Sequence, residues 1–283
     1  MVFCLLVRET LGPPCSSPGR TAPMKSCSGA GPDRAPGRSW MLLRSAASTH
    51  VGMRRQANED RYAIVPSLGL YLVADGMGGH KAGQVASQLA SEGAIRATEA
   101  LQGASVSLAE RLRHAVACAN REIFSAAQSE PELSGMGTTF VGLLFGGERL
   151  ALAHVGDSRA YLVRQGRLRG LTDDHSIVAE LVRRQEISEA DAREHPHRHV
   201  LTRALGVRSR TEPDLAEMTP QEDDVFVLCS DGLTTHVSDE EIARHVSDEL
   251  DLEAAAGDLV STANRAGGLD NITVLLVRYE KES

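Results

Sequence analysis

Acidic side chains stand at the ends of several predicted strands. One aspartate follows or precedes each of four apolar runs: Asp75 in VADGMGG, Asp157 in HVGDSRA, Asp231 in LCSDGLT and Asp270 in GGLDNIT. The pair Glu59 and Asp60, in ANEDRY, precedes a further strand. A lone Asp-Gly is usually only a turn. Strand ends of packed sheets can meet at one edge, however, and carboxylates gathered there repel one another unless cations bind. Oxygen ligands without cysteine suit Mg²⁺ or Mn²⁺.

Glycines follow the first of these aspartates directly, in DGMGGH. Gly76 would let its backbone carbonyl approach a cation beside the Asp75 carboxylate, and Gly78 and Gly79 would let the chain turn into a helix. The patterns of nucleotide-binding loops do not fit: GxGxxG from Gly76 would need glycine where Lys81 stands, and the sequence has no GxxxxGK[ST]. We therefore expect a cation site rather than a nucleotide cradle.

Two further side chains near these carboxylates could take part in chemistry. Arg55, four residues before Glu59, could hold a phosphate through two parallel hydrogen bonds, although an arginine in MRRQ could equally be a solvated surface residue. His80, directly after the glycines, could donate a proton near neutral pH, although a lone loop histidine is usually solvated. Both functional interpretations depend on what the fold brings beside them.

The order of the predicted elements determines where these residues can meet. Apolar runs predict strands near 42–49, 61–65, 69–74, 138–145, 149–155, 159–164, 167–171, 213–218, 224–230 and 272–279. Helical spacing predicts helices near 82–101, 107–128, 176–184, 188–194, 239–246 and 252–266. Strands grouped by short turns, with the helices in separate pairs, indicate an α+β fold. We expect two antiparallel β-sheets packed as a sandwich, with helix pairs on the outer faces.

Composition separates the first 40 residues from the rest of the 283-residue chain. Residues 1–40 are rich in Pro, Gly, Ser and Arg, which predicts disorder and leaves 41–283 as the folded domain. The net charge of -8 and the lack of a basic tract argue against a nucleic-acid partner. Five cysteines without CxxC spacing favour a reducing, cytoplasmic setting. No run of 18 apolar residues occurs, so no membrane span is expected.

Read in chain order, these motifs resemble the metal-dependent protein serine/threonine phosphatases of type 2C (PPM), in their compact bacterial form. The resemblance runs from about Ser45 to Tyr279 and rests on eight segments: GMRRQANEDRY, VADGMGGHKAGQVAS, MGTTFVGLLF, AHVGDSRAYLVRQGRL, LTDDHSIVAELV, HPHRHVLTRALG, VLCSDGLTTHVSDEEI and GGLDNITVLLV. It implies a four-layer α-β-β-α fold. It also implies hydrolysis of phosphoserine and phosphothreonine in proteins by a hydroxide that bridges two metal ions.

The resemblance implies a metal-ligand set as well. Asp75 resembles the ligand that bridges two cations, Mn²⁺ or Mg²⁺. One cation would also be held by Glu59 and the Gly76 carbonyl, and the other by Asp231 and Asp270. Asp157 resembles a ligand of a weaker third cation known in bacterial members.

The remaining roles follow from the same resemblance. Asp60 and Asn271 resemble supporting residues behind the ligands, and Arg55 matches the arginine that holds the phosphate. Eukaryotic relatives carry their proposed acid histidine two places after the bridging aspartate, where this chain has Met77; His80 is then a bacterial-type substitute for it.

HPHRH is unusually rich in histidine. If this segment were extended, His195, His197 and His199 would share one face, either to contact a metal or phosphopeptide or as a solvated edge.

Three functions fit this resemblance. The first is reversal of serine/threonine kinase signalling, with phosphorylated proteins, and a kinase among them, as partners of a free-standing monomer. The second is action on a switch protein such as an anti-sigma antagonist. The third is an inactive pseudophosphatase that only binds, which would be expected to lack one or more central carboxylates. Glu59, Asp75, Asp231 and Asp270 are all present, so an active enzyme is expected.

Overall fold

The computed structural model describes residues 41–248 and 251–281. All of them belong to one compact unit, which spans 39–283. The predicted disordered segment 1–40 lies outside the described residues, so the predicted boundary at residue 40 stays a prediction.

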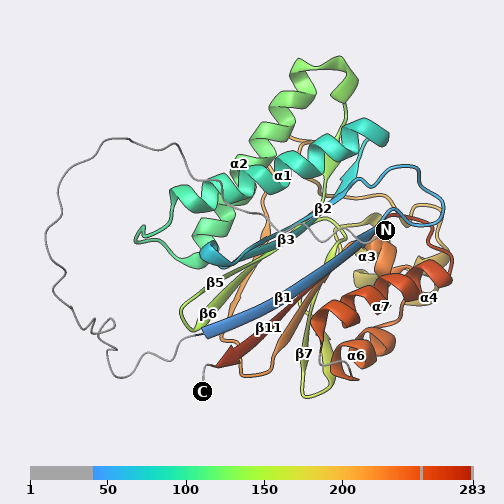
Figure 1. Cartoon of the computed structure of the whole chain (residues 1–283). Helices are drawn as coiled ribbons and strands as arrows, with labels where there is room; N and C mark the ends of the chain where they lie inside the picture. The colour runs from blue at the N-terminus through green and yellow to red at the C-terminus, as the bar shows by residue number, and fades with distance from the viewer. Residues whose placement is uncertain (1–40, 249–250, 282–283) are drawn as a thin grey trace, which may run out of the picture. The chain divides into compact units, whose positions relative to one another are not determined.

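The first sheet contains five antiparallel strands (Figure 1). Their spatial order is β1 (Met41–His50), β11 (Ile272–Lys281), β10 (Val225–Cys229), β7 (Arg159–Arg164) and β8 (Arg167–Gly170). β7 and β8 form the hairpin predicted at RQGRL. Gln165 and Gly166 at its turn both have positive φ, 51° and 72°, as a tight two-residue hairpin turn requires.

The second sheet has the order β2 (Asp60–Val65), β3 (Leu70–Met77), β5 (Phe140–Gly146), β6 (Arg149–Val155) and β9 (Asp214–Met218). A short strand, β4 (Gly137–Thr138), pairs with the end of β3 at Gly76 and Met77. The sequence predicts β4 and β5 as one strand. The structure divides them at Thr139, whose backbone N–H donates to the Asp75 carbonyl oxygen at 2.9 Å.

Long helices cover the outer face of each sheet (Figure 1). α1 (His80–Ala100) and α2 (Leu108–Ser129) pack on the second sheet, and α6 (Asp239–Asp248) and α7 (Leu252–Arg265) on the first. Three shorter α-helices are α3 (Ile177–Arg183), α4 (Glu189–Glu194) and α5 (Asp231–Thr234); two 3₁₀ turns cover Pro66–Leu68 and Pro131–Leu133. α5 is a single turn that helical periodicity could not reveal.

Three apolar layers hold the elements together. One lies between α1–α2 and the second sheet, and another lies between α6–α7 and the first sheet. The third lies between the sheets, where the Phe145 ring packs edge-on against Tyr71 and Phe226. The distances between ring centroids are 5.7 and 5.6 Å. Inner strands are therefore buried on both faces, which explains their continuous apolar runs. The predicted α+β sandwich between helix pairs is confirmed.

In the described part of the chain, none of the helices combines the length and the apolar character that crossing a membrane requires.

Candidate active site

The predicted acidic residues meet in one cleft of about 350 Å³. Its carboxylates come from both sheets: Glu59, Asp75, Asp157, Asp231 and Asp270. Glu59 precedes β2 and Asp75 lies in β3, whereas Asp231 follows β10 and Asp270 precedes β11. Because both sheets end at this edge, residues as distant in the chain as Glu59 and Asp270 line the same cleft.

The backbone around Asp75 is held firmly by the neighbouring strand. The Asp75 N–H donates to Thr139 Oγ1 at 2.9 Å, and the Asp75 carbonyl accepts from Thr138 Oγ1 at 2.8 Å. Thr139 Oγ1 also shares a 2.7 Å hydrogen bond with Ser158 Oγ, directly after Asp157. This role of Thr139 is not visible in the sequence, because a threonine at a strand start is ordinary. It fixes two of the acidic residues relative to each other.

Burial and mutual repulsion disfavour the charged form of these acids. Burial is the main cause that raises the pKa of Asp75 well above its usual range, and the charges of the neighbouring aspartates add to it. Burial likewise raises the pKa of Asp231, with a smaller contribution from repulsion by Asp270. Burial and the charge of Asp231 raise the pKa of Asp157 to about 8. Bound cations would reverse this effect, since they favour the ionised carboxylate.

Asp60 and Asn271 lie directly behind the carboxylates. Asp60 Oδ2 accepts from Ser230 Oγ at 2.8 Å and from Thr273 Oγ1 at 2.7 Å, while burial raises the Asp60 pKa to about 7. The Asn271 amide Nδ2 donates to the carbonyls of Val51 and Ala57, both at 2.9 Å.

Asn271 also contacts the acidic loop itself, because its Oδ1 accepts from the Glu59 N–H at 2.8 Å. Asn271 therefore ties the loop before Asp60 to the start of β11, and the supporting role of both residues stays a prediction.

Close contact between α1 and β3 places Glu59 and Gly76. A Cβ on Gly76 would overlap the Gly83 carbonyl oxygen, and a Cβ on Gly83 would overlap Glu59 Oε2. Two glycines are thus needed for the helix to approach the strand with the Glu59 carboxylate beside it. The sequence indicated Gly76 but not Gly83, because a glycine inside a helix has no local signature.

The cationic side chains of the site have different surroundings. Arg55, half-exposed at 52%, donates to Asp270 Oδ2 at 2.6 Å, and this hydrogen bond raises its pKa further. His80 begins α1, but its side chain lies outside the described part, so its acid role stays a prediction.

The histidine-rich segment consists of turns rather than an extended strand. The three histidines therefore do not share one face. His195 and His197 stay together, with ring centroids 5.6 Å apart. His199 instead lines the cleft, with Nδ1 4.0 Å from Asp231 Oδ2.

The cleft fits cations that keep most of their water. Among the described residues, no group of three or more His, Cys, Asp or Glu side chains is arranged as a complete metal cage. Mg²⁺ and Mn²⁺ accept one or two carboxylates and several waters, so such a cage is not required. Five carboxyl groups face one arginine and one histidine in the cleft, so ionisation of these acids leaves an excess of negative charge that bound cations would neutralise.

Comparisons with known proteins all match this chain to protein phosphatases. The family described as "Protein phosphatase 2C" matches residues 45–272. The chain is 42% identical to the serine/threonine phosphatase Stp of Listeria monocytogenes over 238 residues, which are 82% of this chain and 94% of that protein.

Solved structures agree. The Mycobacterium tuberculosis serine/threonine phosphatase PstP superposes with a TM-score of 0.77 at 40% identity, over 84% of this chain and 99% of that one. The catalytic domain of PstP in complex with two manganese ions gives 0.76 at 38% identity, over 85% of this chain and all of that one.

Proposed function

The chain belongs to the protein phosphatase 2C family, and from that premise we propose how its cleft hydrolyses phosphoserine and phosphothreonine in proteins. The protein is a metal-dependent protein serine/threonine phosphatase that uses Mn²⁺ or Mg²⁺. The observation that carries the proposed site is the convergence of five carboxylates from two sheets on one cleft.

We assign the cations to the acidic residues as follows. Asp75, Glu59 and the Gly76 carbonyl would hold one cation, and Asp231 and Asp270 would hold the other together with Asp75. Asp157 would contribute to a weaker third cation. When bound, the cations supply an activated water as nucleophile and neutralise charge on the phosphoryl oxygens.

The other residues bind the substrate and hold the site in place. Arg55 leaves Asp270 to bind the phosphoryl group, because its guanidinium fork matches two phosphoryl oxygens. His80 donates a proton to the departing serine or threonine oxygen. Asn271 and Thr139 keep the acidic residues in position through the hydrogen bonds described above.

The partners beyond phosphorylated proteins are proposals. We propose that a serine/threonine kinase and its substrates are the physiological partners, and that the enzyme acts as a cytoplasmic monomer. The free thiols of Cys118 and Cys229 support a reducing compartment. A switch protein as substrate has no observation in its favour. A pseudophosphatase is disfavoured because the four central carboxylates all line the cleft.

Substitution of the shared ligand tests this proposal. Asp75→Asn should lower kcat/KM for a phosphothreonine peptide by at least about 10³-fold, because an amide neither carries charge nor bridges cations well. Circular dichroism should show an unchanged fold. Asp258→Asn, an exposed change on α7, is the control. Full hydrolysis by metal-stripped enzyme in excess chelator would refute the two-metal site.

A further inference from the structure

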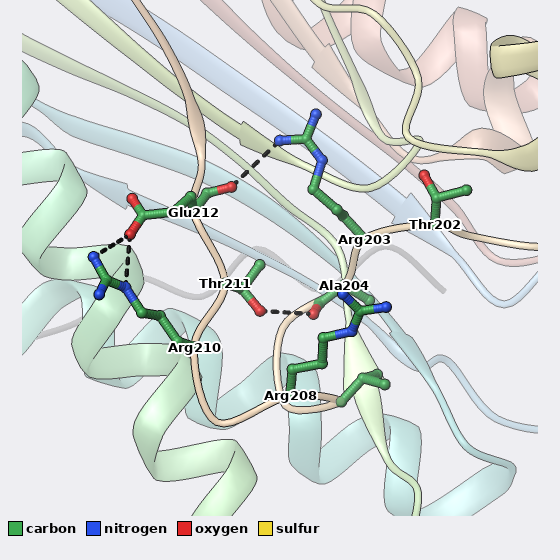
Figure 2. A pocket seen from close by; sticks show the side chains of 8 residues that line it. Thr202, Arg203, Ala204, Arg208, Arg210, Thr211 and Glu212 are labelled. Carbon is green, nitrogen blue, oxygen red and sulfur yellow. Dashed lines mark hydrogen bonds and ion pairs between the residues drawn. The ribbon is translucent and has the colours of Figure 1, made fainter.

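A second, smaller concavity of about 150 Å³ is formed entirely by residues between Thr202 and Glu212 (Figure 2). We call it the arginine pocket, because Arg203, Arg208 and Arg210 line it. Glu212 is the carboxylate in its wall. The pocket is therefore positively charged, in contrast to the acidic cleft.

The arginine pocket lies next to the cleft. Leu201 lines the cleft and the next residue, Thr202, lines the pocket. The cleft and the pocket also approach each other at Gly137, which has Met77 of the cleft and Val207 of the pocket beside it. A Cβ added to Gly137 would lie 2.7 Å from Met77 Cε and 3.0 Å from Val207 Cγ2. A polypeptide bound in the cleft thus needs only a few residues to reach the pocket, since an extended chain advances about 3.3 Å per residue.

Two of the three arginines already have carboxylate partners. Arg210 Nη2 lies 2.7 Å from Glu212 Oε1, and Arg203 Nη1 lies 2.5 Å from Asp214 Oδ1. These arginines keep the pKa of Glu212 below its usual range and that of Asp214 at about 2. These two ion pairs offset the charge of Arg203 and Arg210, so the excess positive charge of the pocket comes from Arg208.

Arg208 is different. In the part of the chain that the structure describes, its side chain makes no hydrogen bond or ion pair, and Figure 2 shows its guanidinium beside Ala204 without a partner. Its backbone carbonyl accepts from Asn120 Nδ2 at 3.1 Å, so the loop position does not depend on the side chain. Arg208 is an exposed cation that lines the pocket on a bonded loop, and its guanidinium is available to a ligand.

We propose that the arginine pocket binds a second phosphoryl group on the same substrate polypeptide, a few residues from the phosphate that is hydrolysed. This inference rests on the proposed function, because it needs a phosphopeptide in the cleft. Arg208 would make charge-assisted hydrogen bonds to the second phosphoryl group, which is a better partner than a singly charged carboxylate. Multiply phosphorylated segments would then be the preferred substrates.

The second phosphoryl group must be tethered to the substrate. An exposed arginine attracts a free anion weakly in water. Once the peptide occupies the cleft, the second group is present at a high effective concentration, so even a weak contact contributes to binding. Free inorganic phosphate should therefore not occupy the pocket at low concentration.

A peptide series tests the proposal. Each peptide carries one phosphothreonine, and a non-hydrolysable phosphonomethyl residue is placed about two to about six residues away on either side. At one or more positions, KM should fall roughly three- to tenfold below that of the parent peptide, with kcat unchanged. A glutamate at the same position should give a smaller gain, and raising the salt concentration should reduce both.

Variants link the gain to the pocket. Arg208→Ala should remove the KM advantage, Arg208→Lys should keep part of it, and Arg208→Glu should turn it into a penalty. Arg167→Ala, at an exposed arginine of β8 that lines neither concavity, should keep it in full.

A KM that no position lowers, or an advantage that survives Arg208→Ala, would overturn the proposal. In that event, metal-dependent hydrolysis of the parent peptide would still support the proposed function. Failure to hydrolyse any phosphopeptide would instead refute the function itself.

Discussion

Arg55 shows how one side chain can serve two partners. Its guanidinium donates to Asp270, an acid proposed as a metal ligand, while about half of the side chain stays exposed. A cation on Asp270 would compete with Arg55 for the carboxylate oxygens and release the guanidinium toward the phosphoryl group. The pairing therefore keeps Arg55 at the cleft. From the sequence alone, Arg55 could equally have been a solvated surface residue.

Replacing His80 and Arg55 by alanine should separate their roles. An alkoxide from serine or threonine needs a proton to leave, whereas an activated aryl phosphate does not. His80→Ala should therefore slow phosphothreonine peptide hydrolysis by roughly 10²–10⁴-fold and affect the aryl phosphate much less. Arg55→Ala should raise KM for both substrates, because both carry the phosphoryl group. Equal slowing of both substrates by His80→Ala would mean that His80 supports the Gly76–Gly79 turn instead.

Single residues differ in how visible they are in the sequence. Asp75, Asp231 and Asp270 could be predicted because each stands at the end of an apolar strand, where side chains from different strands can converge. The supporting role of Thr139 could not, because it comes from hydrogen bonds to the neighbouring strand. Such contacts depend on how distant segments pack, and local patterns carry no information about that.

At the scale of elements, the contact between α1 and β3 decides whether the site can form. Gly83 on α1 and Gly76 on β3 let the two backbones approach, and the Glu59 carboxylate lies against Gly83. A helix normally gains from alanine in place of glycine. Here the glycine is needed because a methyl group would occupy the space of a proposed metal ligand.

Gly83→Ala should therefore weaken metal-dependent activity without preventing folding. We expect the Mn²⁺ concentration for half-maximal activity to rise about tenfold or more, since displacement of Glu59 removes one ligand. Gly257→Ala on α7, where a Cβ would meet no atom within 4 Å, is the matched control. It should raise the free energy of unfolding by about 0.5–1 kcal/mol and leave the Mn²⁺ dependence unchanged. An unchanged Mn²⁺ dependence in Gly83→Ala would show that Glu59 is not a ligand.

Most of the elements could be predicted from periodicity, because buried strands form short apolar runs and amphipathic helices repeat every three to four residues. The division of β4 from β5 and the single-turn α5 could not. Both are set by distant segments: β4 pairs with the end of β3, and α5 packs so closely on the start of β11 that a Cβ on Gly232 would overlap the Asn271 carbonyl oxygen. The strand order in the sheets likewise results from long-range pairing, such as β1 with β11, and was not predicted.

At the scale of the whole folded unit, the site joins the two sheets. Glu59 and Asp75 belong to the sheet covered by α1 and α2, whereas Asp231 and Asp270 flank strands of the other sheet. An apolar layer already holds the sheets together. Cations that bind acids from both sheets would add a second connection between the sheets. They would do so at the edge where repulsion among the carboxylates otherwise pushes the sheets apart.

Metal binding should therefore stabilise the fold, and more strongly as the pH rises. Burial holds the pKa of Asp60 at about 7 and that of Asp157 at about 8, above their values in the unfolded chain. The folded state thus keeps protons that the unfolded chain has released, so the stability of the metal-free protein should fall as the pH rises from about 4 to about 8. Cations replace those protons, and each site should contribute about 2.7 kcal/mol at a hundredfold excess over its Kd.

Urea unfolding with Mg²⁺ or with chelator, at a pH of about 6 and a pH of about 8, measures this effect. The shift in the unfolding midpoint caused by Mg²⁺ should be larger at the higher pH, because fewer protons then compete for the carboxylates. Asp75→Asn should lose most of the shift, since its amide no longer connects the acids of the two sheets through shared cations, whereas Asp258→Asn should keep it. A shift of equal size in Asp75→Asn would place the stabilising cations outside the cleft.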